Sequence, residues 1–137
     1  MGFVHAEITL KNVEDVFRAK NGLIKDHEIR QATVTAMVDT GAGTLVINEK
    51  LRLQLGLGVE GERRATLAND AKEMVKIAEP VSVRWENRDM VCRPLVISGN
   101  GEILLGAIPL EDMDLIVDPV RQALAGAHGD EIVTLIK

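Results

Sequence analysis

The chain has 137 residues, of which 46% are hydrophobic and 27% charged, and its formal net charge is −5. This length predicts one domain over residues 1–137, able to bury roughly two thirds of its unfolded surface. The negative charge argues against nucleic acid as a partner, and no apolar run approaches the ~20 residues that span a bilayer. The lone Cys92 and a start without a secretory signal predict a cytoplasmic protein.

Short apolar segments between frequent turn residues predict a mainly-β fold. Residues 3–10 alternate apolar and polar side chains, which predicts a half-buried strand whose inward side chains are Val4, Ala6, Ile8 and Leu10. Residues 13–22 predict a short amphipathic helix that gathers Val13, Val16 and Phe17 and ends at Gly22. Residues 32–38 are β-branched and nearly uncharged, so we expect a buried strand that runs directly into Asp39.

The middle of the chain predicts one more strand, a short helix and two hairpins. Residues 44–47 form the strand, and Asn48 can cap a helix over 49–55. The first hairpin spans 63–77, with Asn69 and Asp70 as turn residues. The second hairpin alternates from Val81 to Trp85, turns, and returns through residues 90–97.

The last third predicts a buried strand, a glycine and a short acidic helical turn within residues 102–119, with Pro109 near the start of the helical turn. Residues 115–117 predict another strand. Residues 131–137 predict a final strand, and a strand at a terminus needs a neighbour in the same chain or in a partner.

One motif carries chemistry: Asp39, Thr40, Gly41 and Ala42 follow the apolar strand. A carboxylate can activate water for hydrolysis when a second carboxylate shares its proton. Gly41 allows main chain to approach the carboxylate, and the Thr40 hydroxyl can bond to the backbone. Asp and Gly are also ordinary turn residues, so the motif alone is equally consistent with a turn.

The order of segments resembles the retropepsin-like aspartic proteases, the single-domain family of the retroviral protease type. The first family motif is met by Met37, Val38 and Asp39 to Ala42, and the second by Leu104, Leu105 and Gly106. The resemblance covers about residues 3–117. It implies a half-barrel with a flap hairpin and one or two short helices.

The resemblance also implies roles for residues. Asp39 is the expected catalytic carboxylate, and Thr40 supplies a hydroxyl near a two-fold axis, with Gly41 and Ala42 supporting the loop. The flap tip is expected at Ala68, Asn69, Asp70 and Ala71. The chain holds one Asp-Thr-Gly, so the resemblance implies a homodimer that hydrolyses peptides, with neither metal nor cofactor.

The chain departs from the viral pattern at four places. Gly43 replaces an acidic residue that holds substrate backbone, and Ala107 replaces an arginine. Residues 13–30 are an expected insertion, and residues 120–137 an expected family-specific extension. A binding or scaffold module that keeps the fold without proteolysis is therefore an alternative.

Other chemistries have weaker support. His5, His27, His128 and Cys92 lack the spacing of metal ligands, so no metal site is expected, and Cys92 is better read as a core residue. Residues 41–44 could cradle a phosphate, but the Lys-Ser/Thr of a P-loop does not follow. His128 and Asp130 are expected in a polar turn before the last strand.

Overall fold

The computed structural model describes residues 3–136. Its strands are β1 (His5–Asn12), β2 (Gln31–Val38), β3 (Leu45–Asn48), β4 (Val59–Thr66), β5 (Lys72–Ala78), β6 (Val81–Trp85), β7 (Arg88–Cys92), β8 (Leu95–Ile97), β9 (Leu104–Leu105), β10 (Leu115–Asp118) and β11 (Ala123–Gly126). Its helices are α1 (Val13–Lys20), the 3₁₀ turn η1 (Asp26–Glu28), α2 (Glu49–Gln54) and α3 (Ala107–Asp112). The fold is mainly β, as the sequence predicts.

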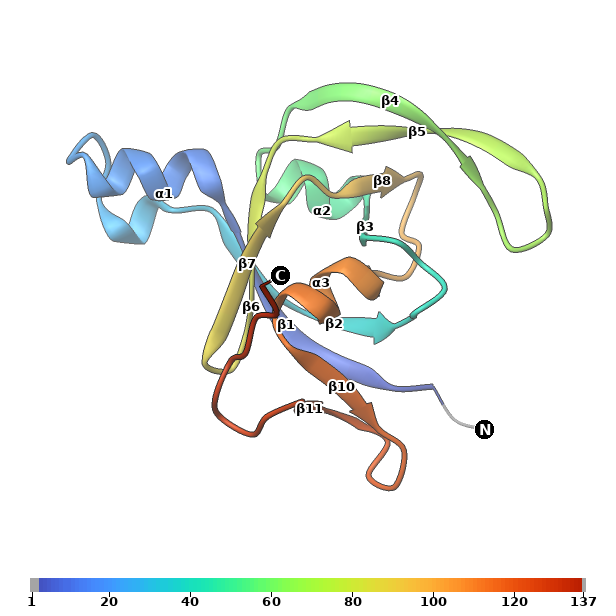
Figure 1. Ribbon diagram of the computed structural model, residues 1–137. Helices are drawn as coiled ribbons and strands as arrows, with labels where there is room; N and C mark the ends of the chain where they lie inside the picture. The colour runs from blue at the N-terminus through green and yellow to red at the C-terminus, as the bar shows by residue number, and fades with distance from the viewer. Residues whose placement is uncertain (1–2, 137) are drawn as a thin grey trace.

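Within the described residues, nine strands form one curled sheet in the order β4-β5-β8-β3-β9-β2-β1-β6-β7. β10 and β11 pair separately, and in Figure 1 they lie at the opposite end of the molecule from the β4–β5 hairpin. The sheet curls because its strands twist and its ends fold over a shared apolar interior. α2 and α3 are short helices next to the sheet, whereas α1 and η1 project to one side (Figure 1).

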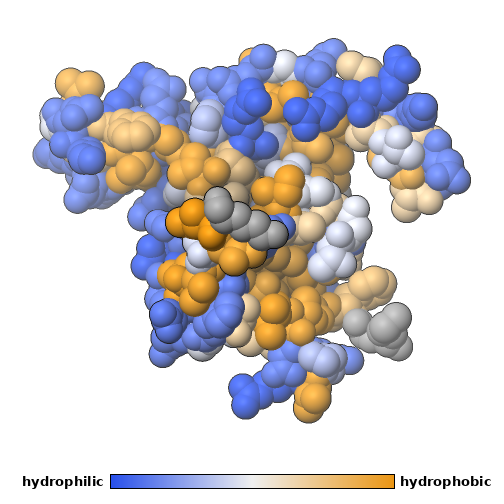
Figure 2. Space-filling model, in the orientation of Figure 1, coloured by the Kyte–Doolittle hydropathy of each residue, from blue (hydrophilic) through white to orange (hydrophobic). Residues whose placement is uncertain are grey.

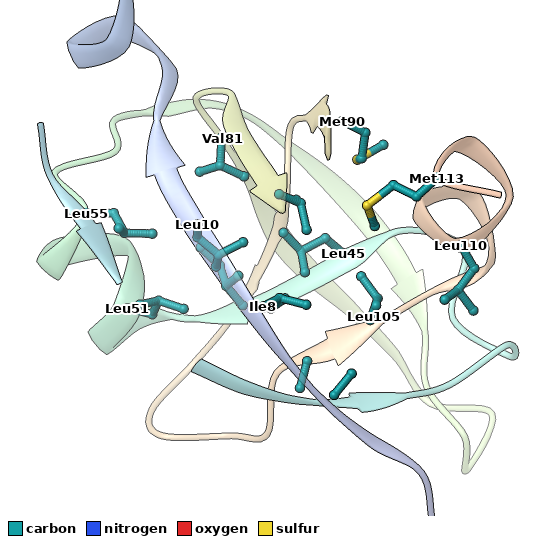
Figure 3. Packing of buried hydrophobic residues seen from close by; sticks show 14 of the residues in the cluster. Ile8, Leu10, Leu45, Leu51, Leu55, Val81, Met90, Leu105, Leu110 and Met113 are labelled. Carbon is teal, nitrogen blue, oxygen red and sulfur yellow. The ribbon is translucent and has the colours of Figure 1, made fainter. Parts of the chain in front are cut away.

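The core lies inside the curled sheet and is built from aliphatic side chains, as the scarcity of aromatic residues predicts. Alternation in β1 buries Ala6, Ile8 and Leu10. Figure 3 shows Ile8 and Leu10 in the interior together with Leu45 and Leu105. Met113, which follows α3, is fully buried in the same cluster. The central strands β3 and β9 therefore cross a packed interior, and the loops at their ends are held by it.

The predicted capping of α2 is confirmed: Asn48 Oδ1 accepts the backbone N–H of Leu51 at 2.8 Å. α1 begins where predicted, but its packing differs from the expectation. Phe17 is 58% exposed, and the buried side chain of this helix is Asp15. Asp15 accepts hydrogen bonds from the backbone and the guanidinium of Arg30. Residues 13–30 are therefore held by an ion pair and not by an apolar face of α1.

The prediction of a terminal strand over 131–137 is wrong for the described residues 131–136, which form no strand apart from one isolated bridge at Glu131. The strand in this part of the chain is β11, which pairs with β10 through a turn. Residues 123–126 are apolar and lack the β-branched residues that are present in 131–137. Residues 123–126 form a strand because they pair with β10, although their intrinsic strand propensity is lower than that of residues 131–137.

Candidate functional site

The Asp39 loop is fixed by hydrogen bonds from both sides. The Asp39 N–H donates to Leu105 O at 3.0 Å, and Asp39 O accepts the Ala42 N–H at 3.0 Å. Asp39 Oδ1 accepts the Gly41 N–H at 2.9 Å, which occupies only one of the two carboxylate oxygens. Asp39 is half-buried, and Thr40 is exposed at the surface of the loop. The carboxylate is thus held in place while it still reaches solvent.

The second motif is inserted directly behind this loop. Leu104 and Leu105 form β9, which runs parallel to β2 and antiparallel to β3. β9 is therefore clamped between the strand that enters the Asp39 loop and the strand that leaves it. The structure brings the two motifs together.

Gly106 is required by close packing against the loop. A Cβ at this position would lie 2.6 Å from Ala42 O and closer still to Thr44 O. The next two residues continue the contact, because the N–H of Ala107 donates to Ala42 O at 2.9 Å and that of Ile108 to Gly43 O at 3.1 Å. The start of α3 is therefore hydrogen-bonded to the Asp39 loop.

The predicted hairpin is formed by β4 and β5, which pair from Thr66 with Lys72 back to Val59 with Ala78. At its tip the Leu67 N–H donates to Ala71 O at 2.8 Å, and the Ala71 N–H donates to Asn69 Oδ1 at 3.1 Å. Asp70 has φ +64°, a left-handed conformation that Asp tolerates. The predicted tip residues, Ala68, Asn69, Asp70 and Ala71, are all exposed. In Figure 1 the hairpin extends on the side of the β2–β3 loop.

A row of half-buried apolar side chains crosses the sheet on the Asp39 face. Its members are direct neighbours in adjacent strands and are here called the apolar row: Met37, Leu104, Val46, Leu95 and Ile77. Side chains alternate between the two faces along a strand. The hydrogen bond from the Asp39 N–H to Leu105 O continues the pairing of β2 with β9 as far as Asp39. Asp39 therefore lies on the same face as Met37. The sequence did not predict this row, because it depends on the register of five strands.

The residues considered for a reactive cysteine, a metal site or a phosphate loop are not arranged for those functions. Burial raises the pKa of the Cys92 thiol to about 11, with a smaller contribution from Asp112, and the side chain packs against the core. Among residues 3–136, no three His, Cys, Asp or Glu side chains are grouped so as to hold a metal ion. Residues 41–44 lead into β3 and not into a helix, so that loop lacks a helix N-terminus for a phosphate.

His128 and Asp130 lie in a polar turn, as predicted, but the turn precedes an irregular tail. His128 Nδ1 lies 2.7 Å from Asp114 Oδ2, and the same oxygen accepts the N–H of Val133 at 3.0 Å. Arg88 is buried, and it donates to the carbonyl oxygens of Asp114 and Gly129. These contacts fasten the tail to the body of the protein. Arg88 falls in the predicted turn of the second hairpin, but in the structure it is the first residue of β7 and is buried.

Comparison with known structures identifies the fold. The chain matches the retroviral protease-like domain of Ddi1 from Leishmania major with a TM-score of 0.55 and 15% sequence identity, over 91% of this chain and 88% of that one. A retropepsin-like aspartic protease from Rickettsia conorii aligns over 85% of this chain and 77% of its own, with 16% identity and a TM-score of 0.49. The first match shows that this chain has the retropepsin-like fold.

The sequence pattern of the aspartyl protease family matches residues 26–108. This stretch is more than half of the chain and contains both motifs and the β4–β5 hairpin. The chain therefore belongs to the aspartyl protease family. No curated protein matches its sequence significantly. Among residues 3–136 no helix is long and apolar enough to cross a membrane.

Proposed function

We propose that this protein is a homodimeric aspartic endopeptidase in which Asp39 of each chain supplies one catalytic carboxylate. The observation that carries the proposal is the hydrogen-bonded union of the Asp39 loop with Gly106 and the start of α3. Gly41 holds one oxygen of the carboxylate, and the side chain reaches solvent. Such a preorganised acidic group suits proton transfer to and from a substrate.

The chemistry requires a second carboxylate, and the sequence holds one Asp-Thr-Gly. A two-fold axis beside the loop would bring a second Asp39 to the first, because an isologous interface places each residue opposite its own copy. The exposed position of Thr40 is compatible with this arrangement. In it the hydroxyls of the two Thr40 residues interlock near the axis.

The dimer surface is proposed to include α3 and the tail. Ile108, whose N–H bonds to the Asp39 loop, is 59% exposed, and Leu135 and Ile136 are 82% and 87% exposed. Ile108 and Leu135 both line a surface hollow of about 650 Å³, so the tail lies next to α3. Figure 2 shows apolar side chains gathered around the C-terminal end of the chain. Exposed apolar groups next to a half-site favour a second copy of the chain as their cover.

The mechanism follows from two carboxylates that share one proton. Such a pair cannot both ionise at about 3 Å separation, so one member is the base that activates water. The other member donates a proton to the peptide carbonyl oxygen under attack. An extended substrate would lie between the apolar row and the tip of the β4–β5 hairpin at residues 68–71, which excludes bulk water. Because the reaction needs that proton, the rate is expected to fall towards alkaline pH.

Substitution of Asp39 by Asn tests this function. Asn keeps the size of the side chain and its bond to the Gly41 N–H, but it cannot act as the base. Hydrolysis of a peptide library should then fall by at least about a hundredfold, while sedimentation still reports a dimer. Unchanged activity in a dimeric Asp39→Asn protein would refute the catalytic role.

The alternative is a non-catalytic binding module with the same fold. It is favoured by Gly43, which offers no side chain to hold substrate backbone and has open space where a Cβ would stand. This function predicts that the wild-type protein and Asp39→Asn bind peptides equally well and that neither cleaves them. The two functions are therefore separated by the same pair of proteins.

A further inference from the structure

His5 and Glu102 form a pair of ionisable side chains outside the Asp39 loop. His5 Nε2 is 3.0 Å from Glu102 Oε1, and the two side chains are 46% and 50% exposed. His5 belongs to β1, and Glu102 stands just before β9. The pair is therefore accessible to a ligand, and it joins two segments that are distant in sequence.

This pair lies on the same face of the sheet as Asp39. His5 is the direct neighbour of Met37, which is the direct neighbour of Leu104. Glu102 precedes Leu104 by two residues, so alternation places both side chains on one face. Glu102 therefore stands at the edge of the apolar row. Because Leu104 pairs with Met37, Glu102 stands opposite residue 35 of β2, which is four residues before Asp39. Four strand residues correspond to a distance of about 13 Å.

The backbone around Glu102 is fixed on both sides. Asn48 Nδ2 donates to Gly101 O at 2.8 Å, and the Met37 N–H donates to Ile103 O at 2.8 Å. With His5 bonded to its carboxylate, Glu102 is held at a defined place. A fixed, accessible acidic group is more consistent with recognition than with general solvation of the surface.

The carboxylate retains capacity for another partner. An ionised carboxylate can accept about four hydrogen bonds, and His5 engages one oxygen. Glu7, exposed and two residues beyond His5 on the same face of β1, adds negative charge nearby. A lysine or arginine side chain matches this environment.

We propose that Glu102, oriented by His5, binds a cationic side chain of the peptide substrate, several residues away from the bond that is cleaved. This inference rests on the proposed protease function. It assigns a substrate class that the Asp39 loop and the apolar row do not specify. In a homodimer the same contact occurs twice, once on each side of the cleaved bond.

The test is cleavage-site profiling of the full chain with a synthetic peptide library randomised on both sides of the cut. Wild type should enrich Lys and Arg three or four residues from the cut by roughly threefold to tenfold. Glu102→Gln should lose this enrichment, and Glu102→Lys should favour Asp and Glu there. Glu14→Gln, on the exposed surface of α1, is the matched control and should keep it. Thermal melting confirms that each variant is folded.

Profiling Asp39→Asn in the same experiment separates failure of the Glu102 proposal from failure of the protease function. Cuts that require Asp39 but show no cationic enrichment, or an enrichment that survives in folded Glu102→Gln, would overturn the inference and leave the protease function intact. Cuts that persist in Asp39→Asn would overturn the protease function itself. A wild-type protein that cuts nothing would contradict both.

Discussion

The peptide N–H of Asp39 donates to the carbonyl oxygen of Leu105 at 3.0 Å, so the two sequence motifs meet through their main chains. This main-chain hydrogen bond fixes the position of the Asp39 backbone, and therefore the point from which its carboxylate side chain extends. The consequence is that residues far from Asp39 in sequence control its position. Gly106 is the clearest example.

Gly106→Ala should destabilise the protein and displace the Asp39 loop. Its Cβ would fall 2.6 Å from Ala42 O and closer to Thr44 O, and backbone oxygens have little freedom to move. We expect a loss of about 3 kcal/mol in the free energy of unfolding, measured by urea denaturation. Gly43→Ala is the matched control because open space surrounds that position. Equal stability of the two variants would contradict this account of the packing.

Asp15→Asn should loosen the segment 13–30, which contains α1. The Arg30 side chain, and next its backbone N–H, keep the pKa of the Asp15 carboxyl below its usual value of 3.8, against the opposing effect of burial. Because the pKa is lowered on folding, this stabilisation is complete well above pH 4 and is lost as pH falls through the folded-state pKa.

At neutral pH we expect Asp15→Asn to lower the free energy of unfolding by about 2 kcal/mol. Glu14→Gln removes an exposed partner of Arg18 on the same helix and should change it by less than about 0.5 kcal/mol. In acid the difference between wild type and Asp15→Asn should shrink. A difference that grows as pH falls would have the wrong sign for this account.

Asp114→Asn should release the tail while the core stays folded. The hydrogen bond with His128 makes the largest contribution to lowering the pKa of the Asp114 carboxyl, and the Val133 N–H makes the next largest. The carboxyl therefore keeps its charge at more acidic pH. Asn tolerates the left-handed backbone at this position, φ +55°, and so only the charge is removed. Amide hydrogen exchange at Val133 should become faster, with β1 and β2 unaffected. Asp112→Asn is the control; the same acceleration there would refute the specific role of Asp114.

Asp70 tests the tip of the β4–β5 hairpin. At φ +64° a glycine is free of strain, whereas a β-branched residue is not. Asp70→Gly should leave the hairpin intact, and Asp70→Val should destabilise the tip by about 1–2 kcal/mol. NMR chemical shifts of residues 66–72 report the difference. If residues 68–71 close over substrate, Asp70→Val should also raise KM.

The sequence predicted most elements because their signals are local. Alternation marked β1, Asn48 marked the start of α2, and Asn69 with Asp70 marked the hairpin tip. The apolar row and the pairing of His5 with Glu102 depend on register between distant strands, which local patterns do not contain. Residues 131–137 were predicted as a strand from their own propensity, but β10 pairs with residues 123–126 instead. The burial of Asp15 was missed because its partner, Arg30, lies outside the helix.

The shared catalytic site is tested by the distance between the two Asp39 carboxylates in an experimentally determined structure of the dimer. We expect the nearest oxygens to lie about 3 Å apart across a two-fold axis, close enough to share a proton. Carboxylates separated by bulk solvent, or a chain that is monomeric at micromolar concentration in sedimentation, would contradict it.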